Sequence, residues 1–251
     1  MELGTKQARE KKPKNIVLQV RDKAVIQWLS RVGLASAGQV ASMFGFSESP
    51  ILRRLQKLRE AGRIGGKKID GDYPVIFWSK IGYFDLPIKQ PNPGTFEHDF
   101  ELTNLHIWLT QQYPSSVITT DRELRQDQDV GHMIAERGKR PHLPDSILEL
   151  GNKRIAIEME NSVKHKNRLQ AIFRQYYSNH DIDQVWYFAT TSGVQNLIAN
   201  NAASCRKIRL FAYPGGTEIP IKGLSEASAD QPKQTSMYDF GLTKGGVAVE
   251  Y

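Results

Sequence analysis

The stretch PDSILELGNKRIAIEME, residues 144–160, decides the fold of the second half of this chain. Its Gly151-Asn152 pair separates two runs of alternating apolar and polar residues, which is the signal of a β-hairpin with a two-residue turn. With that turn, Leu150 faces Lys153 and the register of the whole hairpin follows. The stretch therefore predicts two antiparallel strands whose pairing is fixed by the turn.

The predicted hairpin has one apolar and one acidic face. The apolar face must belong to the core, and it carries Leu148, Leu150, Ile155, Ile157 and Met159. On the other face Asp145 stands opposite Glu158, with Cβ atoms about 5 Å apart, and Glu160 follows on the same side. Carboxylates this close would take up protons or hold a hard cation such as Mg²⁺ or Mn²⁺. A polar face that is simply open to solvent is the alternative.

Composition sets wider bounds on the chain of 251 residues, whose formal net charge is +7. That charge suits a protein that meets phosphate backbones, and equally an ordinary basic soluble protein. The single cysteine, Cys205, excludes an intrachain disulfide and a cysteine-based metal site and favours a reducing, cytoplasmic compartment. No apolar run approaches the roughly 18–20 residues of a membrane span, and the N-terminus lacks the apolar core of a signal peptide. We therefore expect no membrane insertion.

Changes in composition divide the chain into four parts. We expect a basic flexible arm over residues 1–17, a first domain over 18–88, a second domain over 96–220 and a flexible tail over 221–251. The segment KQPNPGT between the two domains has the composition of a linker.

The first domain reads as three helices followed by a β-hairpin. Helices are expected over residues 22–31 and 36–44, with Ser36 as the N-cap residue of the second. A third helix is expected to begin with Ser49 as its N-cap residue, followed by Pro50, and to stop at Gly62. Two short strands follow around an Asp70-Gly71 turn. This order predicts a winged helix-turn-helix whose third helix enters the major groove of DNA.

The basic residues of this domain are its candidate DNA contacts. They are Arg53, Arg54 and Lys57 on the third helix and Lys67 and Lys68 on the wing. Two alternatives stay open: a helical packing unit with a solvated basic face, and a protein-binding domain of the same fold.

The second domain alternates helices and strands around the hairpin. The expected elements are a helix over 96–114, a strand over 116–125, a helix over 163–180, a strand over 184–190, a helix over 192–204 and a strand over 207–214. The predicted class is α+β with a central mixed sheet. Trp186 and Tyr187 lie in the most apolar strand and are expected in the core.

This order, with Pro144-Asp145 before Glu158-Met159-Glu160, resembles the PD-(D/E)xK restriction-endonuclease-like superfamily. The resemblance implies that Asp145 and Glu158 bind the metal ion, with the carbonyl of Met159 as a further ligand. Glu160 stands where that superfamily has its lysine, and Lys164, four residues later, could take the lysine's place.

The combination of a basic winged helix with this motif also resembles the replication-relaxation family, and especially the MobC-type (MOBC) relaxases of mobilisable plasmids. That resemblance implies a metal-dependent endonuclease that nicks one DNA strand at a transfer origin. It also implies an accessory relaxosome protein and a coupling protein as partners. A DNA-binding plasmid replication or transcription regulator with a degenerate nuclease fold is the main alternative, and a restriction enzyme is a third.

Several further residues are candidates around this site. Lys166, Arg168 and Arg174, on the helix after the hairpin, could contact phosphates. His98 and Glu101, on the first helix of the domain, and Tyr177, on the helix after the hairpin, are possible accessory groups. By strand parity His142 is expected to point away from the acidic face, and Tyr176 is expected in the core.

Overall fold

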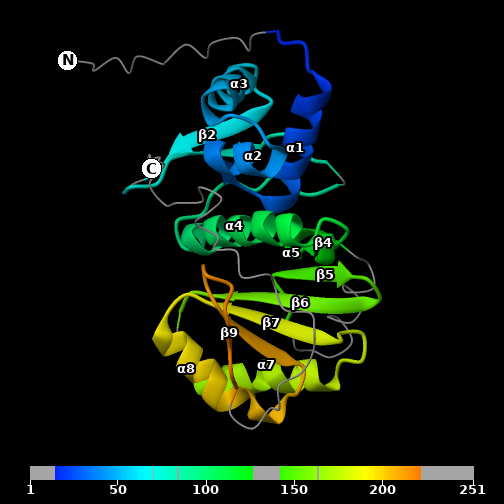
Figure 1. The fold of residues 1–251 in the computed structure, drawn as a ribbon. Coiled ribbons are helices and arrows are strands. Elements are labelled where there is room, and N and C mark those ends of the chain that lie inside the picture. The colour runs from blue at the N-terminus through cyan, green and yellow to red at the C-terminus, as the bar shows by residue number, and fades with distance from the viewer. Residues whose placement is uncertain (1–14, 70, 84, 127–141, 163, 222–251) are drawn as a thin grey trace, which may run out of the picture.

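The computed structural model describes residues 15–69, 71–83, 85–126, 142–162 and 164–221 (Figure 1). Most of the predicted arm and tail and the predicted turn residue Asp70 lie outside these ranges. Helices occur with two sheets, one of them mixed, so the structure agrees with an α+β class at that level. No helix of the described residues is long and apolar enough to cross a membrane.

The first unit contains three helices and a three-stranded antiparallel sheet of order β1-β3-β2. Its elements are α1 (Val20–Val32), β1 (Ala35–Ser36), α2 (Ala37–Phe44), α3 (Glu48–Glu60), β2 (Ile64–Lys68) and β3 (Val75–Ser79). Each helix contributes buried apolar side chains to one core, which includes Ile26, Val40 and Leu55. The three predicted helices and the hairpin are therefore present, and the short strand β1 adds a third partner.

Of the two predicted N-cap residues in this unit, one agrees with the structure and one does not. Ser36 caps α2 as predicted. Its hydroxyl oxygen accepts a hydrogen bond from the Gln39 N–H, and the side-chain oxygen of Gln39 accepts one from the Ser36 N–H. The prediction that Ser49 caps the third helix is wrong, because α3 begins at Glu48 and Ser47 is its N-cap residue. A helix tolerates proline throughout its first turn, so Pro50 did not identify which residue begins the helix.

The second unit is a six-stranded mixed sheet of order β4-β5-β6-β7-β8-β9 with helices on both faces (Figure 1). Its elements are α4 (Phe96–Gln112), β4 (Val117–Thr120), α5 (Asp121–Leu124), β5 (Ser146–Leu150), β6 (Lys153–Glu160), α7 (Lys166–Ser178), β7 (Gln184–Ala189), α8 (Ser192–Asn201), the 3₁₀ turn η1 (Ala202–Ser204), β8 (Ile208–Ala212) and β9 (Glu218–Ile219). Strands β6, β7 and β8 run parallel, and the remaining pairs are antiparallel.

The hairpin has the predicted register. Leu150 pairs with Lys153, Glu149 pairs with Arg154, and the pairs end at Ser146 and Ile157. The apolar face packs against α4, where it meets Leu105 and other apolar side chains in one buried cluster.

The opposite face of the hairpin is covered by α7 and α8 rather than open to solvent. Glu158 and Glu160 on that face are only 2% and 5% exposed. The alternative of a solvated acidic face is therefore wrong for these two residues, and their burial needs a chemical explanation.

The expected strand over 116–125 is shorter than predicted. Strand β4 ends at Thr120, and the chain turns into the short helix α5. Thr120 and Glu123 form a capping box, in which the Thr120 hydroxyl accepts the Glu123 N–H and the Glu123 carboxylate accepts the Thr120 N–H. The T-x-x-E spacing that makes this box possible was visible in the sequence.

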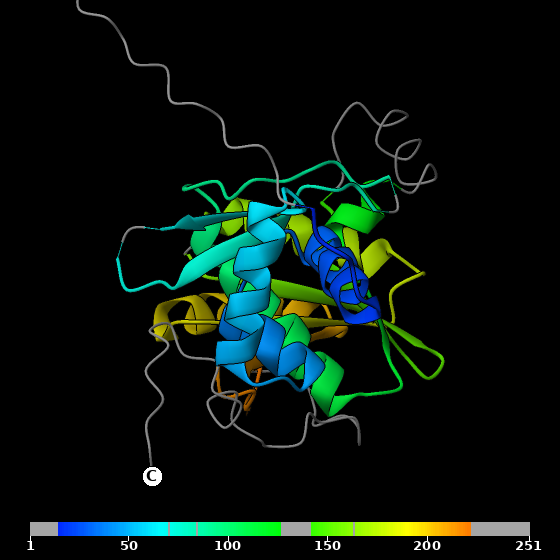
Figure 2. The same ribbon diagram turned by 90° about the horizontal axis from the view of Figure 1, so that it is seen from above.

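Helix α4 lies between the first unit and the sheet of the second and contacts both (Figures 1 and 2). The buried Gln39 side chain of α2 donates to the Phe100 carbonyl and the Asn104 side chain of α4. The Thr103 hydroxyl donates to the Leu34 carbonyl, again between the two units. These buried polar contacts set how the two units are oriented, because leaving any of them unpaired would cost free energy.

Candidate active site

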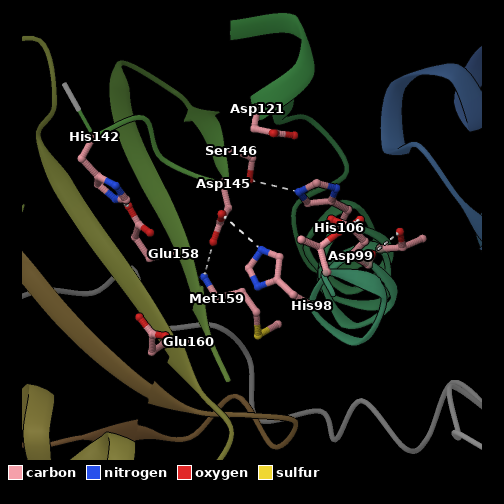
Figure 3. Close-up of polar contacts among 12 residues, drawn as sticks. His98, Asp99, His106, Asp121, His142, Asp145, Ser146, Glu158, Met159 and Glu160 are labelled. Carbon is pink, nitrogen blue, oxygen red and sulfur yellow. Dashed lines mark hydrogen bonds and ion pairs between the residues drawn. The ribbon is translucent and has the colours of Figure 1, made fainter. Parts of the chain in front are cut away.

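A pocket of about 640 Å³ lies where the start of β5, the end of β6 and α7 meet. Asp145, Glu158 and Glu160 all line it, together with Lys164 and Arg168. Figure 3 shows the three carboxylates along the ends of these two strands, with His98 of α4 on one side and His142 on the other. The residues predicted from the hairpin therefore share one pocket.

Asp145 stands directly before β5 and makes two contacts with its carboxylate. One oxygen lies 3.3 Å from Nε2 of His98, and the other accepts the Met159 N–H at 2.8 Å (Figure 3). Burial pushes the pKa of Asp145 up, but the hydrogen bond and charge of His98, the Met159 N–H and the charge of Lys164 outweigh it, so the pKa is lowered. Asp145 is therefore an anion held at the pocket wall.

His98 is the side-chain partner of Asp145. Burial alone would lower its pKa, but the hydrogen bond to Asp145 and the charges of Asp145 and Asp99 raise the pKa of His98 above its ordinary value. The prediction that His98 borders the site agrees with its place in the pocket lining.

Glu158 is the most buried acid of the pocket. His142 Nε2 lies 2.6 Å from its Oε1, and the Tyr176 hydroxyl donates to the same oxygen. Burial and the charge of Asp145 raise the pKa of Glu158, and its contacts with His142 and Tyr176 only partly offset this. Glu158 therefore binds a proton more readily than Asp145, and the two carboxyl groups are electrostatically unlike.

The expectations that His142 points away and that Tyr176 is only a core residue both need correction. His142 contacts Glu158 because it lies in a loop before β5, where the side-chain alternation of a strand does not apply. Tyr176 is 3% exposed, as expected of a core residue, but its hydroxyl reaches the site. The helical spacing of α7 placed the ring correctly and could not show the polar end of the side chain.

Glu160 forms an ion pair with Lys164. Lys164 lies before the start of α7, and its side chain reaches back four residues to line the pocket. The prediction that Lys164 lies at the site therefore agrees with its placement.

The donor atoms of the pocket partly match a hard divalent cation. In the described part of the chain, no three acidic, histidine or cysteine side chains are grouped as metal ligands, so Glu160 does not complete the predicted trio. Mg²⁺, however, commonly uses one or two carboxylates, several waters and a substrate phosphate. Asp145 and Glu158 supply that number.

A buried tyrosine stands on the strand next to these carboxylates. Tyr187 pairs with Glu158 across β6 and β7, and its hydroxyl has no hydrogen-bond partner among the described residues. Burial and the charges of Glu158, Glu160 and Asp145 raise the pKa of Tyr187 well above its ordinary value, so the hydroxyl stays neutral.

The predicted DNA contacts of the first unit divide into exposed and structural residues. Arg53, Lys57, Lys67 and Lys68 are exposed, and Lys68 also donates to the Tyr73 carbonyl. Arg54 is half-buried and already engaged: its guanidinium donates to both oxygens of the buried Asp22 and to the Val17 carbonyl. This pair joins α1 to α3 and stabilises the unit.

The basic residues predicted on α7 are exposed, and most of them lie outside the pocket. Lys166, Arg168 and Arg174 are exposed on α7, and only Arg168 of these three lines the pocket. Glu101 lies away from the pocket, because its carboxylate accepts from Asn104 and Tyr213 on the other face of the sheet.

Tyr177 is 65% exposed and does not line the pocket.

No protein-family model, curated protein or solved structure matches this chain. The family resemblances thus remain predictions.

Proposed function

We propose that this chain is a metal-dependent DNA endonuclease that nicks one strand at a defined site, as in a relaxase for plasmid mobilisation. The observation that carries the proposal is the pair Asp145, directly before β5, and Glu158 of the adjacent strand β6, which line one pocket beside Lys164. In this proposal the first unit is a winged helix and the second a PD-(D/E)xK nuclease domain. The mixed sheet covered by helices on both faces supports the second assignment.

The first unit supplies the proposed DNA-binding surface. The exposed side chains of Arg53 and Lys57 project from α3, and Lys67 and Lys68 project from the β2–β3 hairpin. A helix and a hairpin that carry cations together can engage a groove and the neighbouring phosphates. Such phosphate contacts make affinity strongly dependent on salt concentration.

The pocket supplies the proposed chemistry. A bound Mg²⁺ or Mn²⁺ would act as a Lewis acid on a phosphate oxygen and lower the pKa of bound water. Asp145 and Glu158 would hold that ion. Lys164 and Arg168 line the same pocket and offer positive charge to a phosphodiester.

The unequal carboxyl groups have separate uses. Asp145 stays ionised because its pKa is lowered, whereas the pKa of Glu158 is raised by burial, so Glu158 takes up a proton more readily than Asp145. His142 and Tyr176, both bonded to Glu158, hold this carboxyl in a fixed orientation.

The experiment is a nicking assay on supercoiled plasmid. The purified protein is incubated with a plasmid that carries the transfer origin of its own replicon, in Mg²⁺, in Mn²⁺ and in EDTA. We expect open circles with either metal ion and none in EDTA. Supercoiled DNA that stays intact in both metal ions, with and without the accessory relaxosome protein, would contradict the proposal.

A non-catalytic regulator is the second candidate, and one observation favours it. Glu160 occupies the position of the motif lysine and is itself paired with Lys164, so the nearest lysine is already engaged by a carboxylate. A regulator would bind its DNA site specifically and leave it uncut. The same plasmid assay, run beside a gel-shift measurement, separates the two functions.

A further inference from the structure

A second pocket, of about 780 Å³, opens beside the candidate active site. It lies between the segment that connects the two units, the first turns of α4, and α5. His98, Arg125 and Asp145 line both pockets, so the two pockets adjoin with Asp145 in the shared wall. Figure 3 shows the shared residues Asp145 and His98 beside Asp121 of α5.

The segment that forms one wall of this second pocket is held in place by prolines and by contacts with α4 and α5. The connecting segment contains Pro87, Pro91 and Pro93, and each proline fixes one backbone dihedral. Arg122 of α5 donates to the Pro87 carbonyl, and Lys89 lies 2.9 Å from the Asp99 carboxylate of α4. The segment is thus tied to both helices that face it.

Most of the charged groups of the lining are engaged within the protein. Lys89 pairs with Asp99, Arg125 lies 3.4 Å from Asp121, and His98 contacts Asp145. The fourth basic group, Arg122, donates to the Pro87 carbonyl. A further phosphate would gain less from these engaged side chains than from free cations.

The remaining lining combines apolar surface with amide groups. Ile88 is a large apolar residue that is 55% exposed, and it lines the pocket with Pro87 and Leu102. Asn92 uses its side-chain oxygen on the Gly94 N–H, and Gln126 uses its side-chain nitrogen on the Asp85 carbonyl. The other end of each amide is a donor at Asn92 and an acceptor at Gln126, and nucleobase edges use both kinds of group.

The depth of the first pocket explains why such a base would be unpaired. Glu158 and Glu160 are nearly inaccessible to solvent, so a phosphodiester must enter the pocket to reach them instead of resting on the surface. A phosphate that enters brings its neighbouring nucleotide with it, and a base still paired in a duplex could not follow. The volume of the second pocket lies within the range of sites that hold a small ligand.

We propose that the second pocket is a subsite for one unpaired nucleobase next to the cleaved phosphodiester, with Ile88 as the surface on which the base packs. This inference rests on the proposed DNA-cleaving function and adds to it a single-stranded substrate segment at the cut. The proposal predicts that bases, and not only phosphates, contribute to binding at this place.

The test compares a short oligothymidylate with an abasic strand of the same length, by fluorescence anisotropy in Ca²⁺. The variant Ile88→Ser removes the proposed packing surface, and Val117→Ser is the matched control, since Val117 is equally exposed at 57% and does not line the pocket. We expect the parent and Val117→Ser to bind the base-bearing strand about tenfold more tightly than the abasic strand. We expect Ile88→Ser to lose most of that preference while it binds the abasic strand normally.

The outcomes separate this inference from the proposed function. If Ile88→Ser retains the full preference for bases, or if the parent has none, the subsite is wrong even when the plasmid is nicked. If the plasmid is never nicked but Ile88→Ser alone loses the preference, the subsite stands as a base-binding site of a non-cleaving protein.

Discussion

His106 provides a test of how deeply the α4 face of the sheet is buried. Its Nε2 lies 3.1 Å from the Ser146 hydroxyl, and its buried Nδ1 has no hydrogen-bond partner among the described residues. Burial lowers the pKa of His106 to about 4, and the charge of Asp145 offsets only part of this. A histidine of the unfolded chain keeps a pKa near 6.5.

The sign of the effect on stability follows from these two pKa values. Between pH 6.5 and about 4 the unfolded chain binds a proton that the folded chain excludes, so the free energy of unfolding falls as the pH falls. The full difference corresponds to about 3 kcal/mol. Replacing the imidazole with a group that does not titrate should remove this loss.

The assay is urea denaturation of the parent and of His106→Gln at pH 7 and pH 4.5. We expect His106→Gln to be less stable than the parent at pH 7 and to lose about 2–3 kcal/mol less than the parent on going to pH 4.5. Other groups titrate in both proteins and cancel in this comparison. Equal losses in the two proteins would refute the argument that His106 is held neutral by burial.

Two further predictions concern the first unit. Arg53→Ala should weaken DNA binding, measured by gel shift, without changing stability. Arg54→Ala should lower the free energy of unfolding, measured by urea denaturation, by about 3 kcal/mol, because it leaves the buried Asp22 carboxylate without its partner. The reverse pattern in the two variants would contradict the assignment. Gly65→Ala should destabilise the unit by about 2–3 kcal/mol, since the added Cβ would lie 2.0 Å from the Trp78 ring, and an unchanged thermal midpoint would show that the indole can move aside.

The hairpin could be predicted because local chemistry determined it. A two-residue turn fixes the register of the strands that it joins, and from that register followed the pairing of Glu149 with Arg154 and the division into two faces. The same reasoning identified Asp145 and Glu158 as neighbours in space. Ser36 as a helix cap followed equally from a short-range spacing.

The features that the sequence did not predict depend on contacts between distant segments. His142 reaches Glu158 from a loop, and Arg54 meets Asp22 from another helix, so neither contact follows from the periodicity of a single element. The burial of Glu160 depended on α7 covering that face of the sheet, which no local pattern indicates. Helix α5 differs, because the spacing of Thr120 and Glu123 was an available signal.

The claim that Asp145 and Glu158 perform the cleavage is tested most directly by conservative variants in the plasmid-nicking assay. Asp145→Asn and Glu158→Gln keep the shape of each side chain, and Glu149→Gln, exposed on the same hairpin, is the matched control. We predict that the first two bind plasmid DNA as the parent does but leave it supercoiled in Mn²⁺, while Glu149→Gln nicks normally. Nicking by Asp145→Asn at the parental rate would contradict the account.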